Sequence, residues 1–352
     1  MIIPRNLTLG RKNSNWLFVF LLCFMILLSC KENSPENTPE TSEVEVLQMP
    51  SLARLEYRIN AKLGEGAYWN HQTQELYWVD ILGKELHIYN PATKEDRSLP
   101  TPSRIGTVVP QTDSTAVIAL DDGVYIMNTN SGEINVLSEV EKEMTTNRFN
   151  DGKCDPNGNL WVGSMHLKES EPLGSVYKIS STGETTKMID SVTISNGIVW
   201  TRDAKTMYYI DTPSAEIKAF DYDKSSATIS NQRTAVKVPV EMGFPDGMAI
   251  DEEDMLWVGL WNGNSVARFD PNTGKLISKI EVHAHNVTAC AFGGANLDKL
   301  YITTASVDMT EEEITKYPLA GSVFVANPGV RGVKSDFFAL PTKLESAEAT
   351  NE

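Results

Sequence analysis

Six segments of the chain repeat one pattern, and this repeat limits the possible folds more than any other feature. Each segment has an apolar strand-like run, a short polar gap, an amphipathic run and a turn rich in Gly, Asn, Asp and Pro. The apolar runs start at Leu76, Val117, Leu160, Met207, Leu256 and Leu300. Their spacings are 41, 43, 47, 49 and 44 residues. Units of four short strands at this period are typical of a β-propeller, so we predict an all-β, six-bladed β-propeller.

Helices should be few, because no segment keeps apolar residues at positions i, i+3, i+4 and i+7 over its length. Two tandem β-sandwiches are the alternative all-β fold, but they would not account for six units of nearly equal length. We assign the propeller to residues 55–341 and expect residues 342–352 to form a disordered tail.

The first 29 residues have the composition of an export signal. A basic region precedes the apolar run Trp16–Ser29, and Cys30 follows it directly. This order is typical of a signal peptide, and the sequence "LLSC" resembles a bacterial lipobox, in which the cysteine is lipidated. We therefore expect a lipoprotein signal peptide at 1–29, lipidation at Cys30 and a flexible acidic, Pro-rich tether over 30–54. An uncleaved N-terminal anchor is the alternative.

These features predict a protein that is secreted across the inner membrane. It would be anchored by its lipid to the cell envelope, at the periplasmic or the surface face of the outer membrane. The formal net charge of −16 argues against nucleic acid as a partner, because such binding depends on Lys and Arg contacts to phosphates. We expect a monomer whose only membrane contact is the lipid. Of the four cysteines, Cys154 and Cys290 lie in the body, where free thiols are favoured but a disulfide stays open.

Polar residues recur next to glycine in four of the units. They are Glu65 in "AKLGEGAYWN", Arg148, Asn150 and Asp151 in "RFNDGK", Asn196 in "TISNGIVW" and Asp246 in "FPDGMAID". In a propeller the innermost strands surround a central channel, so residues ahead of or within these strands meet at one mouth. Asn-Gly and Asp-Gly pairs are also common in turns. Their position, once per unit before a predicted inner strand, favours a site.

The body resembles the senescence-marker-protein/gluconolactonase/regucalcin family of six-bladed propellers. The shared motifs include "LYWVDI", "RFNDGK", "LWVGSM", "PDGMAID" and "FGGANLDKLYITTA", and the resemblance covers most of residues 60–335. It implies a central metal-containing channel and a metal-dependent hydrolase that opens sugar lactones, that is, a gluconolactonase-like carboxylic ester hydrolase.

The resemblance also implies the roles of individual residues. Glu65, Asn196 and Asp246 would bind one divalent metal ion, Arg148 and Asn150 would line the substrate pocket, Asp151 would support them and Asp246 would act as general base. Oxygen ligands alone suit Ca²⁺ best, with Mg²⁺ and Mn²⁺ as further candidates. Zn²⁺ is possible, although it usually takes His or Cys. The metal would polarise the lactone carbonyl.

Several further residues and functions stay open. His166 begins the family's substrate loop and is a candidate pocket contact, and Lys168 or Glu169 falls where relatives often carry an acid. His283 and His285 would share one face of a strand and form a possible second metal pair. A non-catalytic metal-binding propeller, serving as a ligand- or protein-binding module, is the alternative to an enzyme. Hydrolysis of another ester or of a phosphoester is also open.

Overall fold

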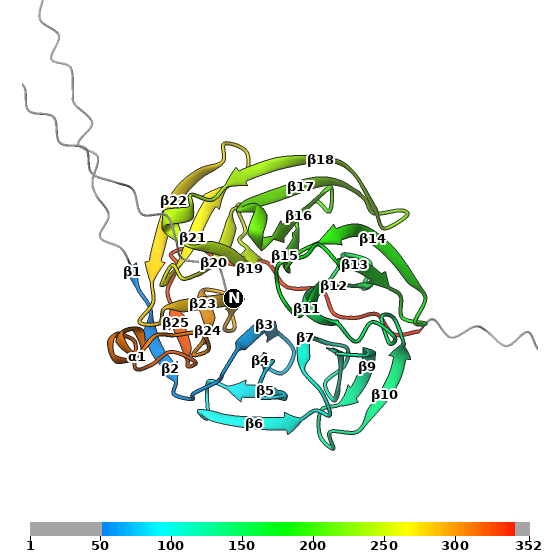
Figure 1. Ribbon diagram of the computed structural model, residues 1–352, viewed down its shortest axis with the longest axis horizontal. Coiled ribbons are helices and arrows are strands. Elements are labelled where there is room, and N and C mark those ends of the chain that lie inside the picture. Colours follow the sequence, from blue (N-terminus) through cyan, green and yellow to red (C-terminus); the bar gives the residue numbers. More distant parts are fainter. Residues whose placement is uncertain (1–50, 342–352) are drawn as a thin grey trace, which may run out of the picture. The chain divides into compact units, whose positions relative to one another are not determined.

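The computed structural model describes residues 51–341, which form six sheets arranged in a ring around a central axis (Figure 1). In the first five blades the chain starts at the innermost strand and runs outward in an antiparallel meander. The innermost strands are β3 (Gly64–Asn70), β7 (Ile105–Pro110), β11 (Asn147–Cys154), β15 (Ser195–Trp200), β19 (Phe244–Ile250) and β23 (Asn286–Gly293). The predicted fold, an all-β six-bladed propeller, is confirmed.

Three further strands complete each blade. The second strands are β4 (Glu75–Asp80), β8 (Thr115–Leu120), β12 (Leu160–His166), β16 (Thr206–Asp211), β20 (Leu256–Trp261) and β24 (Lys299–Ala305). The third strands are β5 (Glu85–Asn90), β9 (Gly123–Asn128), β13 (Gly174–Ile179), β17 (Glu216–Asp223), β21 (Ser265–Asp270) and β25 (Val323–Ala326). The outer strands are β6 (Glu95–Pro100), β10 (Ile134–Ser138), β14 (Thr185–Val192), β18 (Thr228–Lys237), β22 (Lys275–Glu281) and β2 (Arg54–Tyr57).

Helical structure in the described residues is limited to short pieces. They are the α-helix α1 (Glu311–Lys316) and the 3₁₀ turns η1 (Thr212–Ser214) and η2 (Val240–Met242). The expectation of few helices is therefore confirmed. No helix between residues 51 and 341 has the length and apolarity needed to cross a membrane.

The two ends of the described chain close the ring in one blade. Strand β2 pairs with β25 as the outermost strand of the last blade, although the other three strands of that blade lie at the opposite end of the chain. Just before it, β1 (Ser51–Leu52) pairs in parallel with β22 of the preceding blade. Sheet structure thus begins at Ser51, whereas the tether was expected to extend to residue 54.

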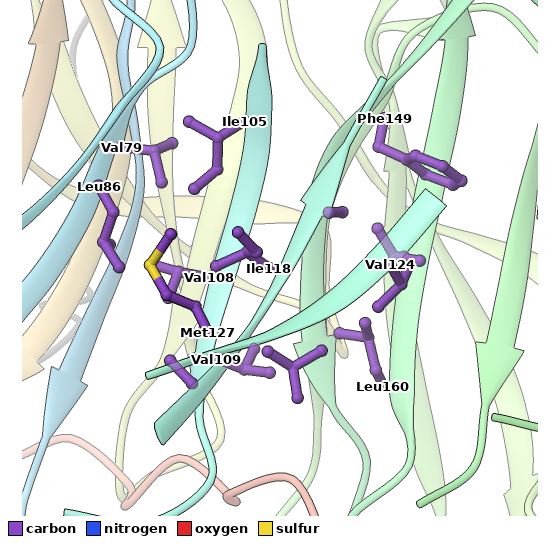
Figure 2. Close-up of a cluster of buried hydrophobic side chains, with 14 of the residues drawn as sticks. Val79, Leu86, Ile105, Val108, Val109, Ile118, Val124, Met127, Phe149 and Leu160 are labelled. Atoms are coloured by element: carbon purple, nitrogen blue, oxygen red, sulfur yellow. The ribbon is translucent and has the colours of Figure 1, made fainter. Parts of the chain in front are cut away.

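The repeated apolar runs are the second strands, and their burial explains the pattern. Neighbouring blades cover both faces of these strands, so nearly every residue in them is buried. The outer strands are mostly exposed. Figure 2 shows one inter-blade core, where Val79, Val108 and Leu160 come from three successive blades. Cys154 and Cys290 are both buried free thiols.

After the last strand, residues 327–341, here called the strap, run across one end of the channel (red in Figure 1). The strap hydrogen-bonds to the C-terminal ends of inner strands: Val333 N–H donates to Ile250 O, and Phe338 N–H donates to Pro110 O. The hydroxyl of Tyr68, in β3, donates to Asp336 O. The signal peptide, Cys30, most of the tether and the tail 342–352 lie outside the described residues.

Candidate metal and substrate site

Every inner strand carries a β-bulge, and the bulges lie at matching places in the six blades. The pairing with the second strand shifts within the intervals Glu65–Tyr68, Ile105–Thr107, Phe149–Gly152, Ser195–Ile198, Pro245–Met248 and Val287–Cys290. A bulge adds a residue to one strand and turns its side chain away from the regular alternation. The predicted site residues Glu65, Asn150, Asp151, Asn196 and Asp246 all lie at or within these bulges.

Gly197 and Gly247 follow the expected amide and carboxylate ligands, and both lie inside strands. A Cβ at Gly197 would lie 2.5 Å from the Cβ of Met248, and one at Gly247 would lie 2.6 Å from the Cβ of Ala289. Met248 and Ala289 belong to the next blade in each case. The Asn-Gly and Asp-Gly pairs are therefore not turns. Glycine is needed because neighbouring inner strands approach each other closely at the level of the site.

A chain of hydrogen bonds connects three of the predicted residues. Arg148 Nη1 donates to Asn150 Oδ1 (2.5 Å), and Asn150 Nδ2 donates to Asn196 Oδ1 (3.0 Å). Asn196 Nδ2 donates to Thr212 Oγ1 (2.7 Å), which in turn donates to Pro245 O (2.8 Å). The amide of Asn196 is thus held with its oxygen toward Asn150. Thr212, which the sequence analysis missed, fixes this orientation from η1.

Three buried carboxyl groups, those of Glu65, Asp151 and Asp246, lie close enough to influence one another. Burial raises the pKa of Asp246 well above its usual range, and the charges of Glu65 and Asp151 raise it further. Burial and the charge of Asp151 also raise the pKa of Glu65. Within the described residues, Asp246 Oδ1 is buried without a hydrogen-bond partner. Three carboxylates buried close together repel one another when all of them are charged. A bound proton or a bound cation stabilises them.

The donor atoms fit a hard divalent cation. Glu65 and Asp246 offer carboxylate oxygens, and Asn196 offers an oriented amide oxygen, which is the ligand chemistry of Ca²⁺ and Mg²⁺. When only His, Cys, Asp and Glu are considered, residues 51–341 contain no group of three placed to hold a metal. The amide of Asn196 is the third oxygen donor of the candidate set.

Arg148 is buried and lies beside this group. Its described hydrogen bonds use Nη1, which donates to Phe149 O as well as to Asn150. Burial lowers the pKa of the guanidinium, whereas the charge of Glu169 raises it. Glu169 thus lies near enough to act on Arg148, at the loop position where an acidic residue was considered.

Two cations near the site were not predicted. Arg104, in the loop before β7, pairs with Asp121 (3.0 Å), and its charge also lowers the pKa of Arg148. Lys153 reaches from β11 to β19, where its Nζ donates to Met248 O (2.7 Å). Its charge lowers the pKa of Asp151 against the effect of burial. Lys153 belongs to the motif "RFNDGK", but no local pattern indicates that its side chain crosses between two blades that are not neighbours.

The histidine candidates take no part in the hydrogen bonds described for this group. His166 is buried at the end of β12, where its Nδ1 accepts a hydrogen bond from Lys168 N–H (3.3 Å). His283 and His285 lie in the loop between β22 and β23, so the expectation of a strand was wrong. His285 Nε2 lies 3.2 Å from Glu313 Oε1 of α1, which indicates a loop contact.

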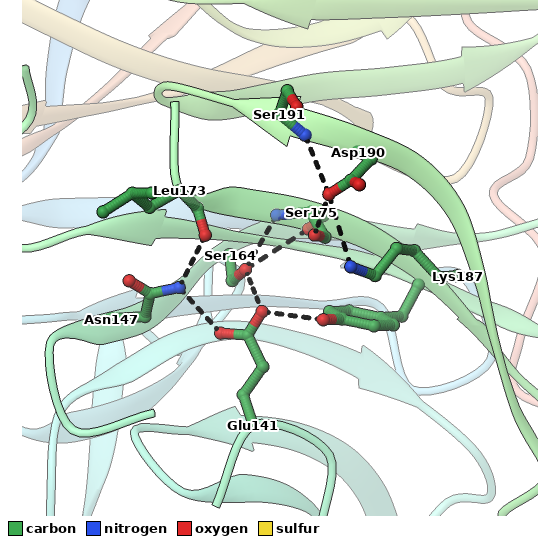
Figure 3. A network of polar contacts seen from close by, with 9 residues as sticks. Glu141, Asn147, Ser164, Leu173, Ser175, Lys187, Asp190 and Ser191 are labelled. Atoms are coloured by element: carbon green, nitrogen blue, oxygen red, sulfur yellow. Dashed lines mark hydrogen bonds and ion pairs between the residues drawn. The ribbon is translucent and has the colours of Figure 1, made fainter. Parts of the chain in front are cut away.

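A polar network supports the entry into β11 and hence the position of Arg148 (Figure 3). Glu141, in the preceding loop, accepts hydrogen bonds from Ser164 Oγ (2.6 Å), Tyr177 Oη (2.9 Å) and Asn147 Nδ2 (3.2 Å). Asn147 also donates to Leu173 O (3.0 Å). Through this network Asn147, the first residue of β11, is connected to strands β12 and β13 and to the loop that carries Glu169.

The sequence places this chain in a known family. Residues 63–306 match the family model described as the SMP-30/Gluconolactonase/LRE-like region, and the chain belongs to this family. YvrE of Bacillus subtilis (strain 168), whose name provisionally assigns it as a sugar lactone lactonase, is 39% identical over 287 residues. That match covers 82% of this chain and 98% of YvrE. Regucalcin of Xenopus laevis is 35% identical over 285 residues, covering 79% of this chain and 95% of regucalcin.

Solved structures agree with the family. A calcium-binding regucalcin from Agrobacterium tumefaciens superposes with a TM-score of 0.79 at 28% identity and covers 83% of this chain and 98% of its own. A luciferin-regenerating enzyme superposes with a TM-score of 0.76 at 32% identity and covers 82% of this chain and 100% of its own. A gluconolactonase from Xanthomonas campestris, at 21% identity and a TM-score of 0.63, covers 78% of this chain and 89% of its own, and shows the shared fold.

Proposed function

We propose that this protein is a metal-dependent hydrolase that opens a sugar lactone, of the gluconolactonase type. The observation that carries the proposal is the buried group of Glu65, Asn196 and Asp246 at the bulges of three inner strands, with Arg148 beside it, one residue before the bulge of a fourth. Membership of the family and the name of YvrE support the same class of reaction.

Asp246 would act as the general base. It would accept a proton from the water that attacks the lactone carbonyl carbon, since its Oδ1 has no described hydrogen-bond partner. A divalent cation held by Glu65, Asn196 and Asp246, with Ca²⁺ as first choice, would supply polarisation of the carbonyl and stabilise the negative charge that develops on its oxygen.

Arg148 would bind the sugar hydroxyls. Its Nη1 is anchored on Asn150, so its other N–H groups can donate to substrate. Asn150 already accepts from Arg148 and donates to Ser195 O and Asn196 Oδ1. We therefore assign Asn150 mainly to positioning Arg148 and Asn196. Asp151 would support the cluster through its charge, and His166 would contact the substrate from the edge of the pocket.

The test is hydrolysis of glucono-δ-lactone by the purified protein, stripped of metal and then refilled with Ca²⁺, Mg²⁺, Mn²⁺ or Zn²⁺. We expect metal-dependent turnover that falls at least about 100-fold in Asp246→Ala, as for loss of a general base. Asp223→Ala, at an exposed position, is the matched control and should retain turnover. Tight metal binding without turnover would contradict the proposal and favour a binding module or a different ester substrate.

We further propose that the reaction takes place in the cell envelope, with the protein held by a lipid on Cys30. The basis is the order of basic region, apolar run and cysteine in the first 30 residues. Metabolic labelling with a fatty-acid analogue would test this location, and Cys30→Ser should abolish both the label and retention in the membrane fraction.

A further inference from the structure

A cavity of about 260 Å³ lies at the end of the channel that the strap crosses. Trp200, Ile250 and Phe292, at the C-terminal ends of three inner strands, line it together with Lys334 and Asp336 of the strap. The carboxyl cluster lies toward the N-terminal ends of the inner strands. The cavity is therefore at the opposite mouth and separate from the proposed active site.

Cationic side chains line this cavity although the protein as a whole is strongly acidic. They are Lys153, Arg202, Lys224 and Lys334. None of the four forms an ion pair with a carboxylate of residues 51–341. Lys153 Nζ and Arg202 Nη1 donate to backbone carbonyls and not to carboxylates. Asp336 is the single acidic residue in the lining.

Trp200 forms part of the cavity wall. Its ring packs edge-on against Trp161 (centroids 5.8 Å apart) and Tyr222 (6.0 Å). Arg202, Lys224 and Lys334 are exposed, and the cavity is thus accessible from solvent.

We propose that this cavity binds a small, multiply charged oxyanion of the phosphate class, either free phosphate or a phosphate ester. Several Lys and Arg side chains around one space are groups that bind phosphate oxygens. The volume is close to the lower end for small-molecule pockets, which fits a ligand of this size. The proposal does not depend on the lactonase activity.

Isothermal titration of the metal-free protein with inorganic phosphate and with glucose 6-phosphate, at fixed ionic strength, tests this site. We expect saturable binding of at least one of them and none of glucose. Lys224→Glu and Lys334→Glu should each weaken binding at least about tenfold, because they reverse a charge at the cavity. Asp336→Asn should strengthen it. The matched control is Lys275→Glu, an exposed residue of β22, which should bind as the unaltered protein does.

One further variant locates the anion. Asp246→Ala should leave binding intact. Loss of binding in Asp246→Ala with retention in Lys334→Glu would place the anion at the carboxyl site and overturn the proposal. Absence of saturable binding, or equal weakening by Lys275→Glu, would overturn it as well. Preference for glucose 6-phosphate over inorganic phosphate would identify an ester as the ligand.

Discussion

The neighbours of Asn196 fix which of its two amide atoms can face a ligand. The residue type alone does not determine this. An amide can present either its oxygen or its nitrogen, and only the oxygen can bind a cation. Thr212 accepts the hydrogen bond from the nitrogen, and Asn150 approaches the oxygen. The hydroxyl of Thr212 is itself fixed on Pro245 O. The orientation of the amide is thus settled before any ligand arrives.

Removal of the Thr212 hydroxyl should weaken metal binding. We expect Thr212→Val, which keeps the size of the side chain, to raise the Kd for Ca²⁺ roughly 10–100-fold, as is usual for loss of a residue that supports a ligand. Thr212→Ser keeps the hydroxyl and should bind nearly as the unaltered protein does. Calorimetric titration with Ca²⁺ measures both. Equal affinities of the Val and Ser variants would show that the hydroxyl has no such role.

At the scale of single elements, strand β2 has the most distinctive structural role. It completes the last blade through its pairing with β25. Its Glu56 accepts hydrogen bonds from Tyr89 Oη (3.1 Å) and Lys94 Nζ (2.5 Å), both in the first blade. The ring of Tyr57 packs against Tyr89 with centroids 5.1 Å apart. One short strand therefore joins the first blade to the last.

A chain that begins at residue 58 should be much less stable than one that begins at residue 53. The shorter chain lacks β2, and at about 1 kcal/mol for each lost hydrogen bond we expect the free energy of unfolding to fall by roughly 3–5 kcal/mol. The chain from residue 53 keeps β2 and lacks only β1, so it is the matched control. Urea unfolding followed by tryptophan fluorescence compares them. Equal midpoints would mean that β2 does not hold the ring closed.

The blades could be predicted from the repeat because each apolar run forms a strand that is buried on both faces, such as β12. A strand of this kind appears in the sequence as a continuous apolar run. The position of Asn196 and Asp246 was also predictable, since each precedes a glycine at a matching place in its blade. Thr212 and Lys153 were not. Their roles depend on contacts with Pro245 and Met248, which lie on other blades, and no local pattern reports such contacts.

At the scale of the whole molecule, the carboxyl cluster joins blades that are far apart in sequence. Glu65, Asp151 and Asp246 come from three inner strands, and their mutual repulsion acts across the channel. A cation held by Glu65, Asn196 and Asp246, as proposed above, would bind the closed ring and not the unfolded chain. Metal binding should therefore stabilise the entire propeller, by about 2.7 kcal/mol at a free concentration 100 times the Kd.

The metal-free protein should lose stability as the pH rises from about 5 to 8. The raised pKa of Glu65 and Asp246 means that the folded protein holds these protons more tightly than the unfolded chain. The free energy of unfolding then falls above the ordinary carboxyl range, near pH 4, by roughly 1.4 kcal/mol for each unit by which a pKa is raised. Thermal unfolding across this pH range measures the effect.

Glu65→Gln should flatten that pH dependence, because it removes one titrating group and the repulsion with it. Glu133→Gln, at an exposed position, is the matched control and should keep the slope of the unaltered protein. Added Ca²⁺ should raise the melting temperature more at pH 8 than at pH 5, since protons compete for the same oxygens. A steeper slope in Glu65→Gln would contradict the linkage.

The pairing of β2 with β25 also affects how the chain can fold while it is being synthesised. Val323, where its partner strand β25 starts, lies 266 residues after Tyr57. At the usual rate of synthesis of about 5–20 residues per second, the two strands are made roughly 15 to 50 s apart. During that interval β2 cannot form its native pairs, and its open edge can attract other strands. The last blade, and with it the closed ring, can therefore form only after β25 has been made.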